Sequence, residues 1–495
     1  MYWNRERMLS LVNDRLGDYQ LILVSNREPY MHVYRGGEIE LVVPASGMAI
    51  ALDSLMQTCG GTWIASGSGE ADQEASDPND SVMVPPKDPK YKLRRIWLTR
   101  EEEKGYYFGF SNEALWPLCH ITYSRPQFQT SHWEIYQAVN RKFADAVLAE
   151  AAEMPGKRTI VFIQDYHFAL LPRLLKEANP NLIICQFWHI PWPSYETFRI
   201  CPWAREILEG LLGNDLLGFH LQYHCNNFFD TVARTMEARV DMEQFAIFRQ
   251  EKATWVQPFP ISVDFERFEE LAQAPETATA LNVFRHRHNL DNIRVGLGVD
   301  RLDYTKGICE RLQALDIFFE KYPQYQRRFT FVQLAPPSRV RIPEYKRLSA
   351  KVESLVEEIN SKYATGRWRP VIFLKTHLSQ EEIVPLYRMA DALVVSSLHD
   401  GMNLVAKEYV ASRVDEGGAL ILSNFTGAAR ELFSAYIINP FHPEGIADAL
   451  LEALEAPPED QGNRMTAMRA WVQEHNIYLW AAQYLRALLH LPVEV

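Results

Sequence analysis

The sequence lacks long apolar runs, paired cysteines and any surplus of positive charge. No hydrophobic stretch approaches the roughly 20 residues that a membrane-spanning helix needs, and the first residues contain no signal-peptide core. The six cysteines form no C-x-x-C pair, which favours reduced, buried thiols over a disulfide framework. These absences predict a cytoplasmic protein without a membrane segment.

Several chemistries are missing as well. The formal net charge is -12, so we expect no nucleic-acid partner, because such a partner requires clustered positive charge. Neither a G-x-S-x-G nucleophile elbow nor a Walker A loop occurs, and no histidines or cysteines have the spacing of zinc ligands. Any anionic ligand must therefore be held by a few local cations.

What the sequence does contain is a regular alternation of strand-like runs and amphipathic helical patterns. The apolar runs lie at 21–25, 159–164, 182–188, 216–220, 293–299, 329–335, 371–375, 392–397 and 419–423. Runs that are apolar on both faces are typical of parallel sheets covered by helices. We expect an α/β protein with two Rossmann-like domains, 1–260 and 261–470, divided where Pro258 and Pro260 interrupt the pattern.

Two cations follow one of the buried runs in "GVDRLDYTKGI". Arg301 and Lys306 lie five residues apart, and Gly307 precedes an expected helix start. Two cations and a helix N-terminus at one strand end suit a diphosphate. Ion pairs with Asp300 or Asp303 are the equally weighted alternative.

A second strand end, "SLHDGMNLVAKEY", carries acids and small residues. If a helix begins near Asn403, residues 401–404 present N–H groups at its positive end, and Gly401 permits close approach of a ligand. Asp400 would then accept from sugar hydroxyls, and Glu408, one turn into the helix, from a ribose. The alternative is a capped helix with a solvent-facing glutamate.

Other candidates are weaker by themselves. Arg27 ends the first expected strand, and a hairpin around Gly36 leads to "PASGMAIAL", a small-residue turn that opens a helix. His189 follows another strand, where a satisfied core histidine is the common outcome. The segment 70–81 is acidic and is expected to be a solvated loop.

Taken together, these motifs resemble one family. "DGMNLVAKEY", "DRLDYTKG", "SNR", "DYH", "HIPWP", "YYFGFSNEALWPLCH" and "APPSR" occur in order between about residues 20 and 445. They are similar to the motifs of the trehalose-phosphate synthase family of retaining glycosyltransferases.

The resemblance implies a GT-B fold, in which the sheets of two Rossmann-like domains face an interdomain cleft. It also implies a C-terminal helix, 471–495, that crosses back to the first domain, while the amphipathic pattern of the first residues predicts a short N-terminal helix within 1–19. The implied reaction transfers glucose from UDP-glucose, or another nucleoside diphosphate glucose, to glucose 6-phosphate with retention. The implied partners are thus a nucleotide sugar and a sugar or polyol phosphate, without a metal or other cofactor; homo-oligomerisation stays open.

The resemblance also assigns residues by motif. The catalytic set is Arg301, Lys306, Asp400 and His189, of which the two cations would bind the diphosphate and the other two the donor sugar. The donor-binding set adds Ser46, Gly47, Leu378, Gly401, Met402, Asn403, Leu404, Val405 and Glu408. The acceptor-binding set is Arg27, Tyr107, Trp116, Asp165 and Arg339, and no metal ligands are assigned.

The chain departs from the family pattern in several places. Ser46-Gly47 stands where two glycines are frequent, Gln164 begins a motif that usually starts with histidine, and Ala65-Ser66-Gly67 replaces a segment that usually carries tryptophan. The segment between Asn26 and Ser46 is longer than in common bacterial members. These differences lie on the acceptor and loop side.

Three alternatives follow. Glucosylglycerol-phosphate synthases, which use glycerol 3-phosphate, have a string similar to "REPY" at 27–30, whereas Arg339 in "APPSR" favours a hexose phosphate. A non-catalytic binding relative would lack one of Arg301, Lys306, Asp400 or Glu408, and all four are present. A phosphorylase would need a pyridoxal lysine site, for which the sequence offers no convincing candidate.

Overall fold

The computed structural model describes residues 2–43 and 47–491, which form two compact units. The N-terminal unit comprises Trp3–Ile261 together with the chain from Tyr478 onward, and the C-terminal unit comprises Ser262–Ile477. The two sequence-predicted boundaries were 260/261 and 470/471.

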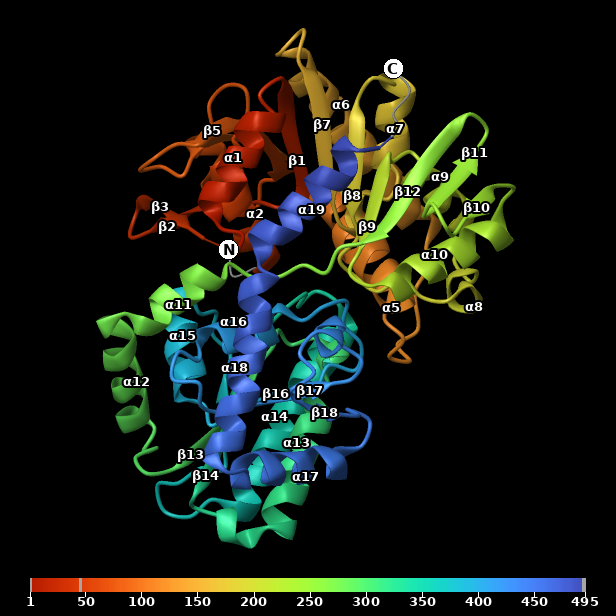
Figure 1. The fold of residues 1–495 in the computed structure, drawn as a ribbon. Coiled ribbons are helices and arrows are strands. Elements are labelled where there is room, and N and C mark those ends of the chain that lie inside the picture. Colours follow the sequence, from red (N-terminus) through yellow and green to blue (C-terminus); the bar gives the residue numbers. More distant parts are fainter. Residues whose placement is uncertain (1, 44–46, 492–495) are drawn as a thin grey trace. The chain divides into compact units, whose positions relative to one another are not determined.

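The N-terminal unit contains a ten-stranded sheet in the order β10-β11-β12-β9-β8-β7-β1-β4-β6-β5 (Figure 1). The stretch from β12 to β6 is parallel, whereas β5, β10 and β11 pair antiparallel at the edges. The strands are β1 (Tyr19–Arg27), β4 (Thr62–Ser66), β5 (Ser81–Val84), β6 (Tyr91–Ile96), β7 (Arg158–Gln164), β8 (Ile183–Phe187), β9 (Leu216–Phe219), β10 (Arg239–Asp241), β11 (Ala246–Arg249) and β12 (Lys252–Pro258). A separate hairpin of β2 (Met31–Arg35) and β3 (Glu38–Val42) confirms the turn predicted around Gly36.

The C-terminal unit contains a six-stranded sheet, parallel throughout, in the order β15-β14-β13-β16-β17-β18. Its strands are β13 (Arg294–Val299), β14 (Phe329–Leu334), β15 (Val371–Leu374), β16 (Ala392–Val395), β17 (Ala419–Ser423) and β18 (Tyr436–Ile438). Five of them were predicted from apolar runs, because central strands covered on both faces need unbroken β-branched and aromatic residues. Short β18 carries only three residues and was missed.

Helices surround both sheets. In the N-terminal unit they are α1 (Arg5–Arg15), α2 (Gly47–Cys59), α3 (Asp72–Ala75), α4 (Arg100–Glu102), η1 (Glu103–Leu115), α5 (Trp116–Cys119), α6 (Thr130–Ala152), η2 (Tyr166–Phe168), α7 (Leu171–Ala178), α8 (Tyr195–Phe198), α9 (Ala204–Leu211), α10 (Gln222–Thr235) and α19 (Ile477–Leu489). In the C-terminal unit they are α11 (Phe265–Gln273), α12 (Pro275–Arg287), η3 (Tyr304–Lys306), α13 (Ile308–Lys321), η4 (Pro323–Tyr325), α14 (Pro343–Tyr363), α15 (Gln380–Met389), α16 (Leu404–Ser412), η5 (Gly427–Arg430), α17 (Pro443–Glu455) and α18 (Pro458–Glu474).

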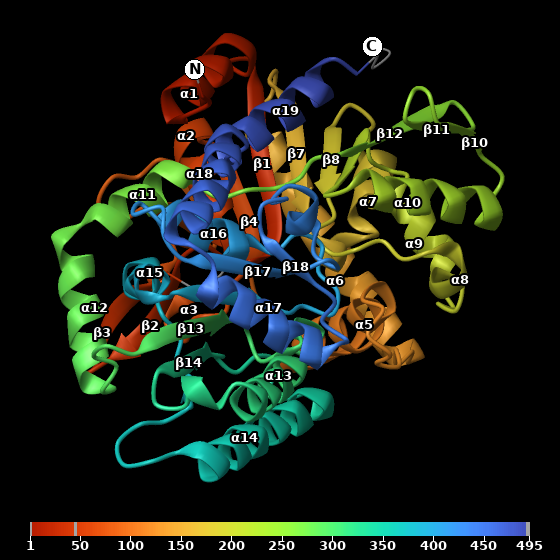
Figure 2. The same cartoon turned by 60° about the horizontal axis from the view of Figure 1, so that its bottom comes forward.

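The C-terminal unit has its main apolar core between the sheet and helices α13, α14 and α17. Figure 2 shows α13 beside α14, and α13 also contacts α17. Phe318, Phe329 and Phe331 are fully buried there. The predicted amphipathic pattern of α14 is confirmed, since Val352 and Val356 lie in this core.

The N-terminal helix predicted within 1–19 is confirmed as α1, Arg5–Arg15. Two other local predictions are wrong. The segment 471–495 is not one helix: α18 ends at Glu474, and α19 begins at Ile477. Within 70–81, Asp72 is fully buried rather than solvated, and its carboxylate lies 3.1 Å from the Arg95 guanidinium.

Helix α19 packs on the N-terminal unit, to which it belongs (Figure 1). The Trp480 indole donates to the carbonyl of Phe259 at 3.2 Å, and the Tyr484 hydroxyl donates to the carbonyl of Gln186 at 2.7 Å. The Tyr484 ring also lies 4.8 Å from Phe162 of β7, centroid to centroid. The last helix therefore buries its aromatic face against this sheet.

Candidate active site

Both sheets reverse their direction of winding at one point. In the C-terminal unit the order, read along the chain, is third-second-first-fourth-fifth-sixth, so the reversal falls between β13 and β16. The parallel strands of the N-terminal unit, read from β6, follow the same order with β12 added as a seventh strand, and the reversal falls between β1 and β7. In such sheets the chains beyond the strand ends diverge at the reversal, and ligands bind there.

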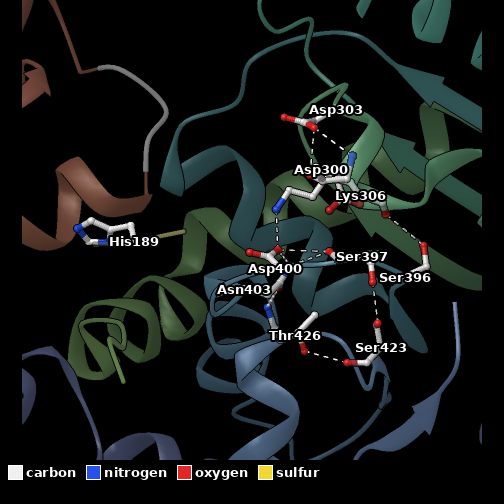
Figure 3. A network of polar contacts seen from close by, with 12 residues as sticks. His189, Asp300, Asp303, Lys306, Ser396, Ser397, Asp400, Asn403, Ser423 and Thr426 are labelled. Carbon is white, nitrogen blue, oxygen red and sulfur yellow. Dashed lines mark hydrogen bonds and ion pairs between the residues drawn. The ribbon is translucent and has the colours of Figure 1, made fainter. Parts of the chain in front are cut away.

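In the C-terminal unit this reversal brings Lys306 and Asp400 together. Lys306 follows β13 and Asp400 follows β16, and their Nζ and Oδ2 atoms are 2.6 Å apart (Figure 3). Asp400 Oδ2 also accepts from Asn403 Nδ2 at 3.1 Å and from the Ser397 hydroxyl at 3.3 Å. Two motifs about a hundred residues apart in sequence therefore form one polar network.

Asn403 connects this network to a helix N-terminus. It is the N-cap of α16, and its side-chain oxygen accepts from the backbone N–H of Ala406 at 3.0 Å. Its φ is 83°, a left-handed conformation that asparagine tolerates better than most residues. The predicted helix start near Asn403 is confirmed, and its positive end lies beside Asp400.

Asp300 and Asp303, the acids named as alternative partners of Arg301 and Lys306, each form an ion pair with another arginine. Asp300 pairs with Arg311 at 2.7 Å, and Asp303 pairs with Arg339 at 3.1 Å. Burial raises the pKa of Asp300. Burial would also raise the pKa of Asp303, but Arg339 and Arg301 outweigh it and lower that pKa overall.

Gly307 shows why this strand end needs a residue without a side chain. Its φ is 62°, and a Cβ atom there would lie 2.1 Å from the carbonyl oxygen of Ser396. The Ser396 hydroxyl in turn donates to the Gly307 carbonyl at 2.8 Å. The β13 and β16 connections thus touch through backbone atoms, which places Lys306 beside Asp400.

Glu408 lies one turn into α16 and is partly buried. Its carboxylate accepts from the Tyr387 hydroxyl at 2.8 Å. Burial raises its pKa, although the tyrosine hydrogen bond opposes that shift. The solvent-facing alternative is therefore wrong for this acid, and no pattern in the sequence pointed to Tyr387 as its partner.

The remaining donor candidates lie near the same helix or outside the described residues. Gly401 and Met402 are buried, and the Met402 carbonyl accepts from the N–H of Ala428 at 2.8 Å. Leu404 and Val405 begin α16, and Leu378 lies just before the α15 cap. Gly47 begins α2 of the other unit, whereas Ser46 lies outside the described residues.

In the N-terminal unit the reversal of strand order places Arg27 and Asp165 at neighbouring strand ends. Arg27 is the last residue of β1 and is exposed, and Asp165 follows β7. Asp165 has φ 75°, and its Oδ1 accepts from the N–H groups of Tyr166 at 3.0 Å and His189 at 3.1 Å. The carboxylate thus fixes the start of η2 and the residues beyond β8.

Aromatic rings pack against the residues that follow Asp165. Tyr107 stacks on His167, with centroids 5.9 Å apart and planes 10° apart. Trp116 lies 5.9 Å from Tyr166, whose hydroxyl donates to Asn112 at 2.8 Å. Tyr107 belongs to η1, a π-helix of 13 residues, an unusual geometry that occurs often at functional sites.

Close packing on α6 accompanies this π-helix. A Cβ atom at Gly105 would lie 2.5 Å from Ile135, and one at Gly109 would lie 2.4 Å from His132. Only glycine allows this approach of η1 to α6. The sequence signal was a pair of glycines four residues apart, which by itself does not specify a π-helix.

With both sites described, comparison with known proteins identifies the family. Residues 19–490 match the model of glycosyltransferase family 20. The chain belongs to glycosyltransferase family 20. The resemblance seen in the sequence is confirmed, and so is the expected GT-B fold class with two Rossmann-like units.

This family 20 glycosyltransferase has relatives of known name along nearly its whole length. A trehalose-6-phosphate synthase of Mycolicibacterium vanbaalenii is 39% identical over 97% of this chain and 98% of its own. The solved structure described as trehalose-6-phosphate from E. coli bound with UDP-2-fluoro glucose has a TM-score of 0.84 and 30% identity, over 95% of this chain and 99% of its own. An alpha,alpha-trehalose-phosphate synthase from Burkholderia xenovorans, in complex with glucose-6-phosphate, has a TM-score of 0.84 and 29% identity over the same shares.

Two residues of the "REPY" string have structural partners in this glycosyltransferase. Glu28 is buried, and its carboxylate accepts from Arg95 Nε at 2.8 Å. The Tyr30 hydroxyl donates to Asp53 of α2 at 2.8 Å. Both side chains support the connection after β1, so the string carries little information about the acceptor.

Two other kinds of site are absent from the described residues. No helix in residues 2–43 and 47–491 is long and apolar enough to span a membrane. Over the same ranges, no group of three or more histidine, cysteine or acidic side chains is arranged to hold a metal ion.

Proposed function

We propose that this protein is a retaining glucosyltransferase that moves glucose from UDP-glucose to glucose 6-phosphate, forming α,α-trehalose 6-phosphate and UDP. The observation that carries the proposal is the Lys306–Asp400 pair beside the N-terminus of α16, at the reversal of strand order. The names of the full-length relatives support the same reaction.

The donor diphosphate would exchange partners with the side chains of this network. In the described structure Lys306 is held by Asp400, which also has hydrogen bonds from Asn403 and Ser397. A bound diphosphate would take the Lys306 ammonium, and the Asp400 carboxylate would then accept from donor-sugar hydroxyls. Both groups are already in place, so little reorganisation is needed when negative charge develops on the leaving phosphate.

Arg301 and Glu408 would complete the donor site. Arg301 follows the same strand as Lys306, and a guanidinium binds phosphate oxygens in a fork. Glu408 would accept from the ribose hydroxyls while retaining its hydrogen bond from Tyr387. We propose that Arg301 and Lys306 supply the charge stabilisation, and we assign no metal.

Retention is proposed to follow a front-face path. The glucose C1–O bond to the leaving phosphate breaks as the acceptor oxygen attacks C1 from the same face. A leaving phosphate oxygen takes the proton of the attacking hydroxyl, so no enzyme nucleophile is required. Arg301 and Lys306 would stabilise the negative charge of the departing diphosphate.

The acceptor would be glucose 6-phosphate. Arg27 would contact its phosphate, Asp165 its hydroxyls, and Tyr107 and Trp116 would line the sugar. Arg339 is the fifth assignment, and its guanidinium is buried against Asp303. Its predicted acceptor role therefore competes with a structural role, which the experiments below separate.

The test is to incubate the protein with UDP-glucose and, in separate reactions, glucose 6-phosphate or glycerol 3-phosphate, and to measure UDP release. Release with glucose 6-phosphate, and an α,α-linked product by NMR, is the expected result. Release with glycerol 3-phosphate alone would replace the acceptor with a polyol phosphate. If no pair gives release, the protein is a binding relative and the proposed reaction is wrong.

A further inference from the structure

The end of β7 carries a buried amide that touches His189. Gln164 is the last residue of β7 and is fully buried, and His189 follows the neighbouring strand β8. The side-chain oxygen of Gln164 lies 2.9 Å from His189 Nε2. Gln164 stands where the family usually has histidine.

This contact determines which imidazole nitrogen carries the hydrogen. An amide oxygen can only accept, so Nε2 must carry the hydrogen and donate it. In the neutral ring the other nitrogen, Nδ1, is then an acceptor. Such a tautomer can accept from a sugar hydroxyl, whereas the protonated ring can only donate.

Backbone contacts hold His189 in place without charging it. Its N–H donates to Asp165 Oδ1 at 3.1 Å, and its carbonyl accepts from His220 Nε2 at 3.0 Å. The rings of Phe187 and His220 lie 4.6 and 5.7 Å away, centroid to centroid. Asp165 and His220 are thus titratable neighbours among the described residues, and each has a hydrogen bond with the His189 backbone.

We infer that Gln164 is a positioning residue, which accepts from Nε2–H of His189, keeps the imidazole neutral and presents Nδ1 as the acceptor for a donor-sugar hydroxyl. Burial supports this state, because it lowers the pKa of His189 to about 3. The inference rests on the proposed function and on the donor-sugar contact that the family resemblance implies for His189.

The decisive variant is Gln164→Glu. A carboxylate of nearly the same shape would still accept from Nε2–H, but its charge would raise the pKa of His189. As the pH falls, the ring would become imidazolium and Nδ1 would carry a hydrogen. We expect kcat/KM for UDP-glucose to fall about tenfold or more between pH 8.5 and pH 6 in this variant, beyond any change in the wild type.

Two further variants separate positioning from structure. Gln164→Leu removes the acceptor without adding charge, so we expect kcat/KM to fall several-fold, on the order of one lost hydrogen bond, with no new dependence on pH. Gln129→Glu adds the same charge at an exposed position of the same unit and should match the wild type. A Gln164→Glu profile parallel to that of the wild type would overturn the inference.

A second measurement does not depend on turnover. Nitrogen-15 NMR of protein with labelled histidine rings, with His189 assigned by loss of its signals in His189→Gln, reports which nitrogen carries the hydrogen. We expect Nε2–H and bare Nδ1 at pH 7, and the imidazolium in Gln164→Glu at pH 6. Hydrogen on Nδ1 in the wild type would overturn the inference. If neither the wild type nor any variant transfers glucose, only the proposed function is overturned.

Discussion

The two units place their site residues at the same point of the same strand order but join them by different forces. In the C-terminal unit, Lys306 and Asp400 form an ion pair across the reversal of strand order. In the N-terminal unit, Asp165 accepts from backbone N–H groups, and Tyr107 stacks on His167. An ion pair organises the strand ends of the C-terminal unit, whereas hydrogen bonds to backbone N–H groups and stacked rings organise those of the N-terminal unit.

This difference agrees with the proposed chemistry. A leaving diphosphate needs cations that are already held in position, as Lys306 is by Asp400. A sugar hydroxyl needs directional acceptors and a flat apolar surface, which carboxylates and aromatic rings provide. The same backbone topology thus supports two kinds of binding through the residues that follow each strand.

The strongest way to break the comparison is Lys306→Ala. It removes the cation proposed to stabilise the leaving phosphate, so we expect kcat to fall about 100- to 1000-fold. The measurement is steady-state UDP release with both substrates saturating. Lys321→Ala, which removes a largely exposed pair with Asp448 in the same unit, is the control and should change little. A loss below about tenfold would mean that charge at this strand end does not carry catalysis.

Arg27 of the N-terminal unit and Arg339 of the C-terminal unit are both assigned to acceptor binding, and an alanine variant tests each assignment. Arg27→Ala changes an exposed residue, so we expect acceptor KM to rise about tenfold or more with an unchanged melting temperature. Arg339→Ala should also raise acceptor KM, but it removes the guanidinium paired with the buried Asp303 carboxylate, and breaking such a pair costs roughly 3–5 kcal/mol of stability.

The double variant Asp303→Asn/Arg339→Ala separates the two effects of Arg339. Removing both charges should restore part of the stability, because no buried charge is left unpaired. It should not restore acceptor KM. If acceptor kinetics are unchanged in Arg339→Ala, this arginine is structural and does not belong to the acceptor site.

Glu408 sharpens the comparison within the donor site. Burial raises its pKa, so the carboxylate takes up a proton at a higher pH than an ordinary glutamate. Because ribose hydroxyls need an ionised acceptor, UDP affinity should weaken as the pH falls. Calorimetry should show this trend in the wild type and about tenfold weaker, flatter binding in Glu408→Gln. Tyr387→Phe should keep the carboxylate and weaken binding less.

The smallest effect on activity is expected at Glu28, in the scaffold of the N-terminal unit. Burial and the nearby Asp72 carboxylate raise its pKa to about 8, against the opposing effect of Arg95. The folded protein therefore binds a proton that the unfolded chain releases near pH 4.5, so stability should fall as the pH rises from about 5 to 8. Urea unfolding at several pH values should show this slope, and Glu28→Gln should flatten it. An equal slope in both proteins would mean that Glu28 is ionised throughout.

Sequence alone was sufficient where one chemical pattern has one structural outcome. The apolar runs became buried strands because only parallel strands covered by helices bury both faces. Asn403 became a helix cap, since its side chain replaces a missing backbone acceptor. The family, the fold class and the residues at the two strand ends followed from motifs of this kind.

Tertiary structure alone decided which of those residues meet. The strand orders bring Lys306 to Asp400 and Arg27 near Asp165, and no local pattern specifies an order of strands. It also buried Glu28 and Asp72 with Arg95, paired Arg339 with Asp303, and set Gln164 against His189. The physical reason is that propensity and periodicity act over a few residues, whereas ion pairs and hydrogen bonds depend on distances that only the packed chain fixes.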